Sequence, residues 1–324
     1  MSILSRRSFT AVCVALLAAG AAVAQTFPDR AVRIVVPYPP GGFNDTLARV
    51  SAEKLNKVWN QPVIVENKPG GNTTVGNLFV AKSPADGYTI LITPLPFAAL
   101  PGLYGSQLGY DALKDFTPLV WAGSTQNALV VRNDLPVSNV QELLDYAKKN
   151  PGKLNYGSTG SGSSNHLSME LLMRMTGAKL AHIPYKGSAP ATMAILGGDI
   201  DALFDNVPNV LPHIKAGKMK VIAVSGLQRS VLLPAVPTVA ESGVPGYEVN
   251  VWFGMQLPAG TPKPIVEKIN RDVVQLLKEP EVVKRFREQG VEVVASSPAD
   301  FSQLVQKEVV KWTQLIRDAN IRIE

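Results

Sequence analysis

Cysteine is almost missing from this chain of 324 residues, and its scarcity excludes several kinds of chemistry. The only cysteine is Cys13, near the N-terminus, so the rest of the chain can form no disulfide and offers no thiolate. No His-Glu-x-x-His or Cys-x-x-Cys motif is present, which argues against a zinc site. The glycine-rich residues 157–162 match neither G-x-G-x-x-G nor the P-loop. We therefore expect no metal and no cofactor.

The residue groupings of hydrolytic enzymes are also missing. No G-x-S-x-G motif is present, although Gly-Ser-Gly-Ser at residues 160–163 partly resembles one. The three histidines, His166, His182 and His213, stand far apart in the chain. We interpret them as polar surface residues or hydrogen-bonded helix ends. The sequence therefore predicts no catalytic residues and a protein that is not an enzyme.

Clusters of charge are absent as well. Lysine and arginine exceed the acidic residues, giving a net charge of +6, but the basic residues are scattered and no run of five occurs. This pattern gives a mild attraction for anions and does not indicate nucleic-acid binding. With 46% hydrophobic and 18% charged residues, the composition is that of a globular protein.

The N-terminus carries an export signal. Arg6 and Arg7 precede an apolar stretch at residues 11–22, and Ala22-Val23-Ala24 suits a cleavage site before Gln25. We expect residues 1–24 to be removed and the mature protein to be periplasmic. The arginine pair also resembles the twin-arginine motif; the general secretory route fits equally well, and the two stay open.

Strand and helix signals alternate from residue 26 onward, which indicates an α/β fold with mostly parallel strands. The length suits two domains. Because the tail, residues 263–319, reads as three helices, we expect it to pack back onto the first lobe. The prediction is a first lobe of residues 25–124 and 246–324, a second lobe of residues 125–245, and a ligand cleft between them. The chain would cross between the lobes near residues 123–124 and 249–253.

Two loops rich in glycine and hydroxyl residues each follow a predicted strand and precede a predicted helix. Backbone N–H groups and the positive end of the helix dipole face outward at such a junction, which suits a carboxylate. Two such loops on separate units predict two lobes that close on one acidic solute. The candidate ligand-binding residues are Gly41, Gly42, Phe43, Asn44 and Asp45 in the first loop, and Ser158, Thr159, Ser161, Ser163 and Asn165 in the second.

Three further residues are candidates for the cleft. Lys186 lies in a Tyr-Lys-Gly segment that suits a turn lining the cleft. Asp205 follows a buried strand, where a carboxylate needs partners; we expect it to orient donors or to meet a polar part of the ligand. Phe97 lies in an apolar loop, and an aromatic ring there would contact an apolar ligand.

Four motifs, in the same order along the mature chain, resemble the Bug-type solute-binding proteins of the tripartite tricarboxylate transporters. They are Pro37-Tyr38-Pro39-Pro40-Gly41-Gly42 with Asp45 and Arg49, Gly157-Ser158-Thr159-Gly160-Ser161-Gly162 with His166, Pro184-Tyr185-Lys186-Gly187, and Leu257-Pro258-Ala259-Gly260-Thr261-Pro262. The resemblance implies a two-lobed periplasmic binding protein of the type II, Venus-flytrap kind. It also implies capture of a carboxylic acid by main-chain donors, hydroxyls and water, typically without an arginine clamp.

The same resemblance implies delivery of the solute to a large and a small membrane subunit, by a protein that we expect to be monomeric. Phe43 stands where the family usually has a small or polar residue, and residues 93–100 are more apolar than is common there. Both departures favour an apolar or aromatic mono- or dicarboxylate over citrate or an amino acid. Two alternatives stay open: a binding protein that presents its ligand to a membrane sensor, and, less favoured, a periplasmic hydrolase.

Overall fold

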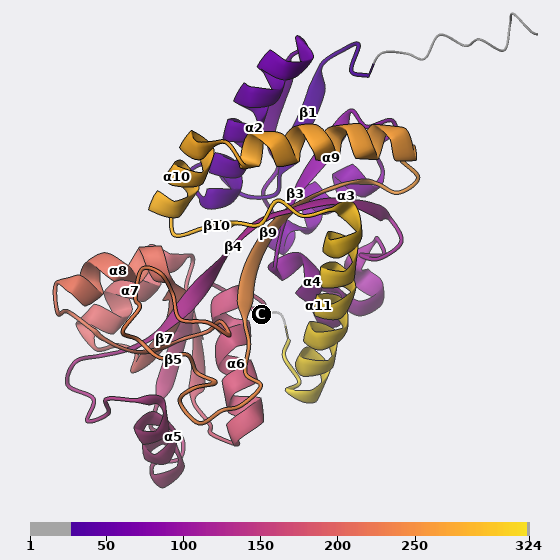
Figure 1. Ribbon diagram of the computed structural model, residues 1–324. Helices are drawn as coiled ribbons and strands as arrows, with labels where there is room; N and C mark the ends of the chain where they lie inside the picture. Colours follow the sequence, from indigo (N-terminus) through magenta and orange to yellow (C-terminus); the bar gives the residue numbers. More distant parts are fainter. Residues whose placement is uncertain (1–26, 323–324) are drawn as a thin grey trace, which may run out of the picture.

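The computed structural model describes residues 27–322 (Figure 1). The predicted signal segment and its cleavage site lie outside these residues. The helices and strands, in chain order, are β1 (Val32–Val36), α2 (Phe43–Trp59), β2 (Val63–Asn67), the 3-10 turn η1 (Gly71–Thr73), α3 (Thr74–Ala81), β3 (Thr89–Pro94), α4 (Pro96–Tyr104), the 3-10 turn η2 (Gly105–Leu108), β4 (Phe116–Val131), α5 (Val140–Lys149), β5 (Asn155–Ser158), α6 (Ser164–Thr176), β6 (Ala181–Pro184), α7 (Ser188–Gly197), β7 (Ala202–Asn206), α8 (Val207–Lys215), β8 (Lys220–Val224), β9 (Asn250–Pro258), α9 (Lys263–Leu277), α10 (Pro280–Glu288), β10 (Glu292–Val293) and α11 (Pro298–Asp318).

Two long strands join the two regions of the molecule. The strand order is β2-β1-β3-β9-β4-β7-β5-β6, with β10 and β8 also paired to β4. The N-terminal part of β4 pairs with β9 and β10, and its C-terminal part pairs with β7 and β8. We call the part built on β1, β2, β3, β9 and β10 the β1 region, and the part built on β5, β6, β7 and β8 the β5 region. Figure 1 shows β4 and β9 passing between them.

The expectation of mostly parallel strands holds only within each region. Strands β1, β2 and β3 pair in parallel, as do β5, β6 and β7. Every pair that includes β4 or β9 is antiparallel. The reason is topological: β4 carries the chain out of the β1 region and β9 carries it back, so the two connecting strands run in opposite directions.

The start of helix α5 is set by its cap. The helix begins at Val140, because the Asn139 side chain caps it by accepting a hydrogen bond from the Glu142 amide at 2.9 Å. The Glu142 carboxylate in turn accepts from the Ser138 amide at 2.7 Å. This reciprocal pattern is a capping box, and it fixes where the helix starts.

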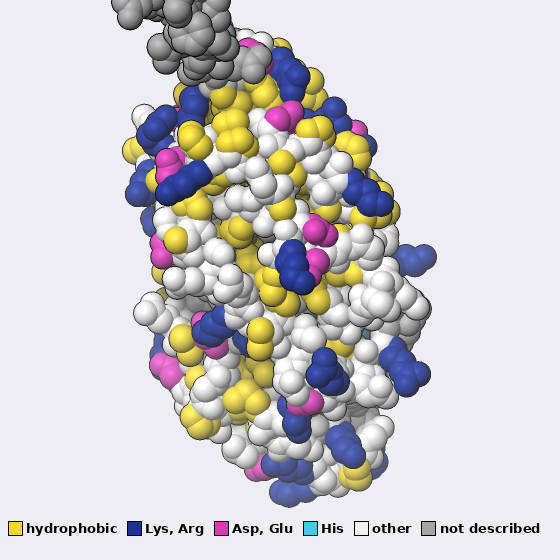
Figure 2. Space-filling model, turned by 90° about the vertical axis from the view of Figure 1, so that its right-hand side faces the viewer, with side chains coloured by type: hydrophobic (Ala, Val, Ile, Leu, Met, Phe, Trp, Pro, Cys, Tyr) yellow, Lys and Arg dark blue, Asp and Glu magenta, His cyan; other side chains and the backbone are white. Residues whose placement is uncertain are grey.

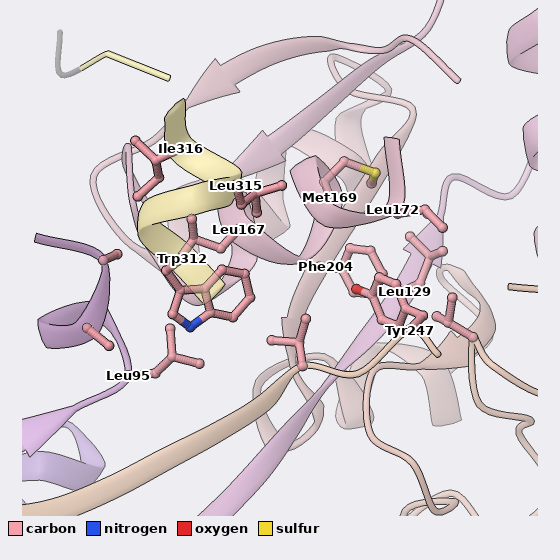
Figure 3. Packing of buried hydrophobic residues seen from close by; sticks show 14 of the residues in the cluster. Leu95, Leu129, Leu167, Met169, Leu172, Phe204, Tyr247, Trp312, Leu315 and Ile316 are labelled. Carbon is pink, nitrogen blue, oxygen red and sulfur yellow. The ribbon is translucent and has the colours of Figure 1, made fainter. Parts of the chain in front are cut away.

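The C-terminal helices pack on the β1 region, as expected, but α11 also reaches the β5 region. Helix α9 packs against α2 and β4, and α11 packs mainly against α4. The last turns of α11 belong to the same buried hydrophobic cluster as α6 (Figure 3). The labelled members on these two helices are Trp312, Leu315 and Ile316 of α11 and Leu167, Met169 and Leu172 of α6. Arg174 of α6 also pairs with Asp318 of α11 at 3.1 Å. The core is therefore continuous between the two regions on this side.

The surface agrees with the scattered charge of the sequence. Figure 2 shows basic and acidic side chains interspersed over one face, with hydrophobic side chains between them. Within residues 27–322 no helix is long and apolar enough to cross a membrane.

Candidate functional site

The first loop, residues 37–45, is held by an ion-pair network centred on Asp45. The Asp45 carboxylate accepts hydrogen bonds from Nε and Nη2 of the Arg49 guanidinium (2.8 and 3.1 Å), from Asn67 (3.0 Å) and from the Gly41 amide (3.2 Å). The hydrogen bond from Arg49 is the largest cause that lowers the pKa of Asp45 below its ordinary value. The carboxylate is 5% exposed, so it orients the loop and leaves the solute to other groups.

Helix α2 begins with an open N-terminus. Its N-cap is Gly42, and no side chain among residues 27–322 caps it. Among the described residues the amides of Phe43 and Asn44 have no hydrogen-bond acceptor. A side chain added at Gly41 or Gly42 would meet no atom within 4 Å. Free N–H groups at a helix N-terminus beside open space form a suitable anion site.

The ring of Phe43 packs on other protein rings. It lies 4.5 Å from Phe253 and 4.9 Å from Phe286, measured between ring centroids, and it joins the core cluster of the β1 region. Phe253 and Phe286 are almost fully buried. The ring therefore anchors the start of α2, and its proposed contact with an apolar ligand gains no support from its packing.

The second loop, residues 158–163, is held by neutral hydrogen bonds. The Ser158 hydroxyl lies 2.6 Å from Nε2 of His182 and accepts from the Gly160 amide at 3.1 Å. The Gly162 amide donates to Nδ1 of His166 at 3.0 Å. The Ser163 side chain caps α6 by accepting from the His166 amide. Ser158 has no exposed surface, so its part is to shape the loop.

The amides that alternate with these glycines remain free. Within the described residues, the backbone N–H groups of Thr159, Ser161, Ser164 and Asn165 have no protein acceptor. The Ser161 hydroxyl also makes no protein hydrogen bond there, whereas the Thr159 hydroxyl donates to Asn165 at 2.7 Å. The loop therefore offers several unused donors next to the N-terminus of a 13-residue helix, which favours an anion.

We expected the histidines to be polar surface residues or hydrogen-bonded helix ends. His166 is a hydrogen-bonded residue in the first turn of α6, whereas His182 lies half-buried on β6, which corrects the interpretation for that residue. The rings of His166 and His182 stack with centroids 4.0 Å apart and an interplanar angle of 9°. Glu170 lies 3.6 Å from Nε2 of His166 and accepts from the Tyr156 hydroxyl at 2.6 Å. The i,i+4 spacing of His166 and Glu170 was visible in the sequence, but the stacking joins separate elements and was not.

The second loop touches the β1 region directly. Asn72 of η1 donates to the Ser161 carbonyl at 3.3 Å. At Gly162, where φ is +78°, an added side-chain carbon would lie 2.4 Å from Leu103 of α4. The sequence analysis did not identify Asn72 or Leu103, because neither lies in a motif. The loop is thus both a candidate anion site and a contact between the two regions.

Asp205 and Asn165 form a buried polar cluster behind the second loop. The Asp205 carboxylate is 1% exposed and accepts from Asn165 (3.1 Å), Asn209 (3.1 Å), the Asn206 amide (2.7 Å) and the Ser188 hydroxyl. Burial raises the pKa of Asp205. The amide group of Asn165 also donates to the Phe204 carbonyl at 2.8 Å. These contacts suit Asp205 to orient donors, one of the two roles expected for it, and its part in ligand binding stays a prediction.

Two predicted site residues lie outside this cluster. Phe97 has no exposed surface. Its ring centroid lies 5.2 Å from that of Phe116 and 6.1 Å from that of Tyr110, so Phe97 is a core residue. Its apolar segment is part of α4, whose interior face must be buried. Lys186 is exposed, at the turn before α7.

Three further buried polar atoms belong to Asn44, which the sequence analysis named, and to two strand-end residues that it did not. The side-chain oxygens Oγ1 of Thr93, Oδ1 of Asn206 and Oδ1 of Asn44 are buried and have no hydrogen-bond partner among the described residues. Thr93 lies on β3 and Asn206 ends β7. Buried polar groups normally have partners, so these three atoms are candidates to bind a solute. The positions of Thr93 and Asn206 near strand ends could have been used to find these two residues.

No metal site accompanies these groups. Within residues 27–322 no group of three or more histidine, cysteine or acidic side chains could hold a metal ion.

Two regions joined by long strands, with free backbone N–H groups in the loops before α2 and α6, are features of the periplasmic binding proteins. The chain belongs to the tripartite tricarboxylate transporter receptor family, whose model matches residues 47–321. The family and its solved relatives are solute-binding proteins and not enzymes. The chain has the same mixed α/β fold as these solved relatives.

Named relatives cover nearly the whole chain. Protein BugT of Bordetella pertussis is 35% identical over 303 residues, which is 93% of this chain and 93% of BugT. Rpa4515 of R. palustris, solved with adipate, is 37% identical, covers 92% of this chain and 100% of its own, and has a TM-score of 0.80. MatC from Rhodopseudomonas palustris, with bound malate, is 32% identical over 90% of this chain and 100% of its own, with a TM-score of 0.77.

Proposed function

We propose that this protein is exported to the periplasm and captures a small carboxylic acid there, between a first lobe of residues 25–124 and 246–324 and a second lobe of residues 125–245. It then delivers the acid to the large and small membrane subunits of a tripartite tricarboxylate-type transporter. One observation carries the proposal: each region presents free backbone N–H groups at a helix N-terminus, and the second of the two loops touches the other region through Asn72.

Main-chain donors suit this role better than an arginine clamp. Arg49, the arginine nearest the first loop, is occupied by Asp45, and the second loop contains no basic residue. Each hydrogen bond from an N–H group to a carboxylate contributes about 1.5–3 kcal/mol. A few such bonds are enough for tight binding, and they hold the ligand without a charged partner.

For the ligand we propose a mono- or dicarboxylate with an apolar or aromatic body, with adipate as the first candidate. The rings of Phe43 and Phe97 pack on other protein rings, so they no longer support contact with an apolar ligand. The apolar composition of residues 93–100 remains as an indirect argument for such a ligand. The relative solved with adipate, at 37% identity, is the more direct support. The relative with bound malate makes a short hydroxylated diacid the competing choice.

The test is a binding screen of the mature protein. Thermal shift and calorimetry are measured with adipate, benzoate, malate, citrate, glutamate and aspartate. A ligand at 100 times its dissociation constant adds about 2.7 kcal/mol of stability. We expect adipate or benzoate to bind most tightly; tightest binding of citrate or an amino acid contradicts the ligand class. Binding of none contradicts carboxylate capture, and turnover of a bound acid would favour the hydrolase.

Delivery is tested separately from binding. Deletion of the gene should abolish uptake of the tightest-binding acid by cells that contain the membrane subunits. Normal uptake, together with loss of a transcriptional response to the acid, would favour the membrane-sensor alternative.

A further inference from the structure

His166 lies directly beneath the second loop and is almost completely buried, at 3% exposure. Its Nδ1 accepts the hydrogen bond of the Gly162 amide, so Nδ1 carries a lone pair and the ring proton belongs to Nε2. Nε2 faces Glu170, whose carboxylate is also fixed by Tyr156. Glu170 and Tyr156 therefore favour the tautomer that the Gly162 amide requires.

The second imidazole, that of His182, reaches Gly160 indirectly, through the Ser158 hydroxyl. His182 stacks on His166, with ring centroids 4.0 Å apart, and also on Tyr156, at 5.0 Å. Its Nε2 is hydrogen-bonded to the Ser158 hydroxyl, which accepts from the Gly160 amide. The amides of Gly160 and Gly162 are thus both bound within the protein, and the alternating amides of Thr159 and Ser161 are left over.

The same loop carries the contact with the β1 region. The Ser161 carbonyl accepts from Asn72, and Gly162 packs against Leu103. A loop that loses the Gly162 anchor would change both the direction of its free amides and this contact. Because the peptide of residues 161 and 162 is shared, one hydrogen bond controls both features.

We propose that His166 is a positioning residue for anion binding: by accepting the Gly162 amide, its Nδ1 holds the loop in the conformation that offers the Thr159 and Ser161 amides to a carboxylate. The proposal rests on the proposed function for its ligand. The anchoring of the loop is a property of the solute-free protein and can be tested without a ligand.

The test compares two polar variants of similar size. In His166→Asn the side-chain oxygen takes the place of Nδ1 and can still accept the Gly162 amide. In His166→Gln the oxygen takes the place of Nε2, so the acceptor is lost while a polar side chain remains. The measurements are amide hydrogen exchange of Gly162 by NMR, calorimetry with adipate, and the melting temperature of the solute-free protein.

We expect His166→Asn to keep Gly162 protected and to bind adipate within about twofold of the wild type. His166→Gln should lose the protection and bind adipate about fivefold more weakly, the equivalent of one neutral hydrogen bond. Both variants lose the same stacked ring, so their melting temperatures should be similar.

Two results would overturn the proposal. One is a Gly162 amide that stays protected in His166→Gln. The other is an equal loss of protection or affinity in both variants, which would assign the effect to the ring's packing. If the wild type binds none of the carboxylates in the screen, the proposed function fails, whereas the Gly162 exchange still decides whether His166 positions the loop.

Discussion

The loop after β1 is held by an ion pair, whereas the loop after β5 is held by neutral hydrogen bonds. In the first, Asp45 binds Arg49, Asn67 and the Gly41 amide. In the second, His166 and Ser158 bind the Gly162 and Gly160 amides. Both loops end at a helix N-terminus, yet α2 has no side-chain cap and α6 is capped by Ser163.

This difference gives the two loops different sensitivities. The ion pair keeps its charge until the pH falls below the lowered pKa of Asp45. The second network includes His182, whose pKa burial lowers from 6.5 to about 4, so its imidazole stays uncharged until the pH falls well below 6.5. Two loops at the same kind of strand–helix junction can therefore respond differently to acid. The predictions below test this, beginning with the largest effect.

Replacement of the aromatic anchor of the first loop should have the largest effect. We expect Phe43→Ala to lower the free energy of unfolding by about 2–3 kcal/mol, somewhat less than for a fully buried ring, because Phe43 is partly exposed. Phe43→Leu should lose less. Chemical denaturation measures both. A large loss of ligand affinity with unchanged stability would instead show that the ring contacts the solute.

Removal of the carboxylate of the first loop should come next. Asp45→Ala removes the acceptor of the Gly41 amide and one of the two acceptors of the Asn67 side chain, and we expect a loss of about 2 kcal/mol in the free energy of unfolding. The control is Arg49→Ala, which should lose less, because Arg49 is half exposed and Asp45 keeps its other donors. Equal losses in the two variants would show that the ion pair alone holds the loop.

Acidification should destabilise the second loop before the first. Burial lowers the pKa of His182 from 6.5 to about 4, with the neighbouring His166 as a second cause. Because the unfolded chain binds the proton more readily, stability is fully present above pH 6.5 and is lost as the pH falls toward 4. Allowing for partial solvent screening, we expect a loss of about 1–2 kcal/mol over this window.

The matched control for the pH prediction is His182→Gln. The side-chain amide can still bond to Ser158 but does not titrate, so the loss between pH 6.5 and 4 should be smaller than in the wild type. Denaturation curves at a series of pH values compare the two proteins. Identical pH profiles would show that His182 does not contribute to the acid sensitivity.

The smallest expected effect concerns the two hydroxyls of the second loop. Ser161→Ala should weaken binding of the tightest acid about fivefold, because the Ser161 hydroxyl has no protein partner among residues 27–322 and is available to the ligand. Thr159→Ala should change affinity less, since that hydroxyl is bonded to Asn165. Calorimetry gives the affinities, and the ligand-free melting temperature of Ser161→Ala should be unchanged. Wild-type binding by both variants would assign the ligand to main chain and water alone.

Much of the fold could be predicted because its signals are local. The strand–loop–helix units around residues 37–45 and 157–165 follow from an apolar run, a turn-forming segment and helical periodicity. The full length of β4 could not be predicted, since its 16 residues belong to two regions and meet different neighbours along the strand. Its hydrophobic pattern changes where those neighbours change.

The sequence alone determined that two glycine-rich loops precede helices and leave N–H groups unpaired, because helix geometry fixes those donors within a few residues. Tertiary structure decided which side chains accompany them. Phe43 turns to Phe253 and Phe286, and His166 stacks on His182, and these partners come from other strands and helices. A side chain adopts the direction in which burial and hydrogen bonding are both satisfied, and that depends on elements brought together only when the chain folds.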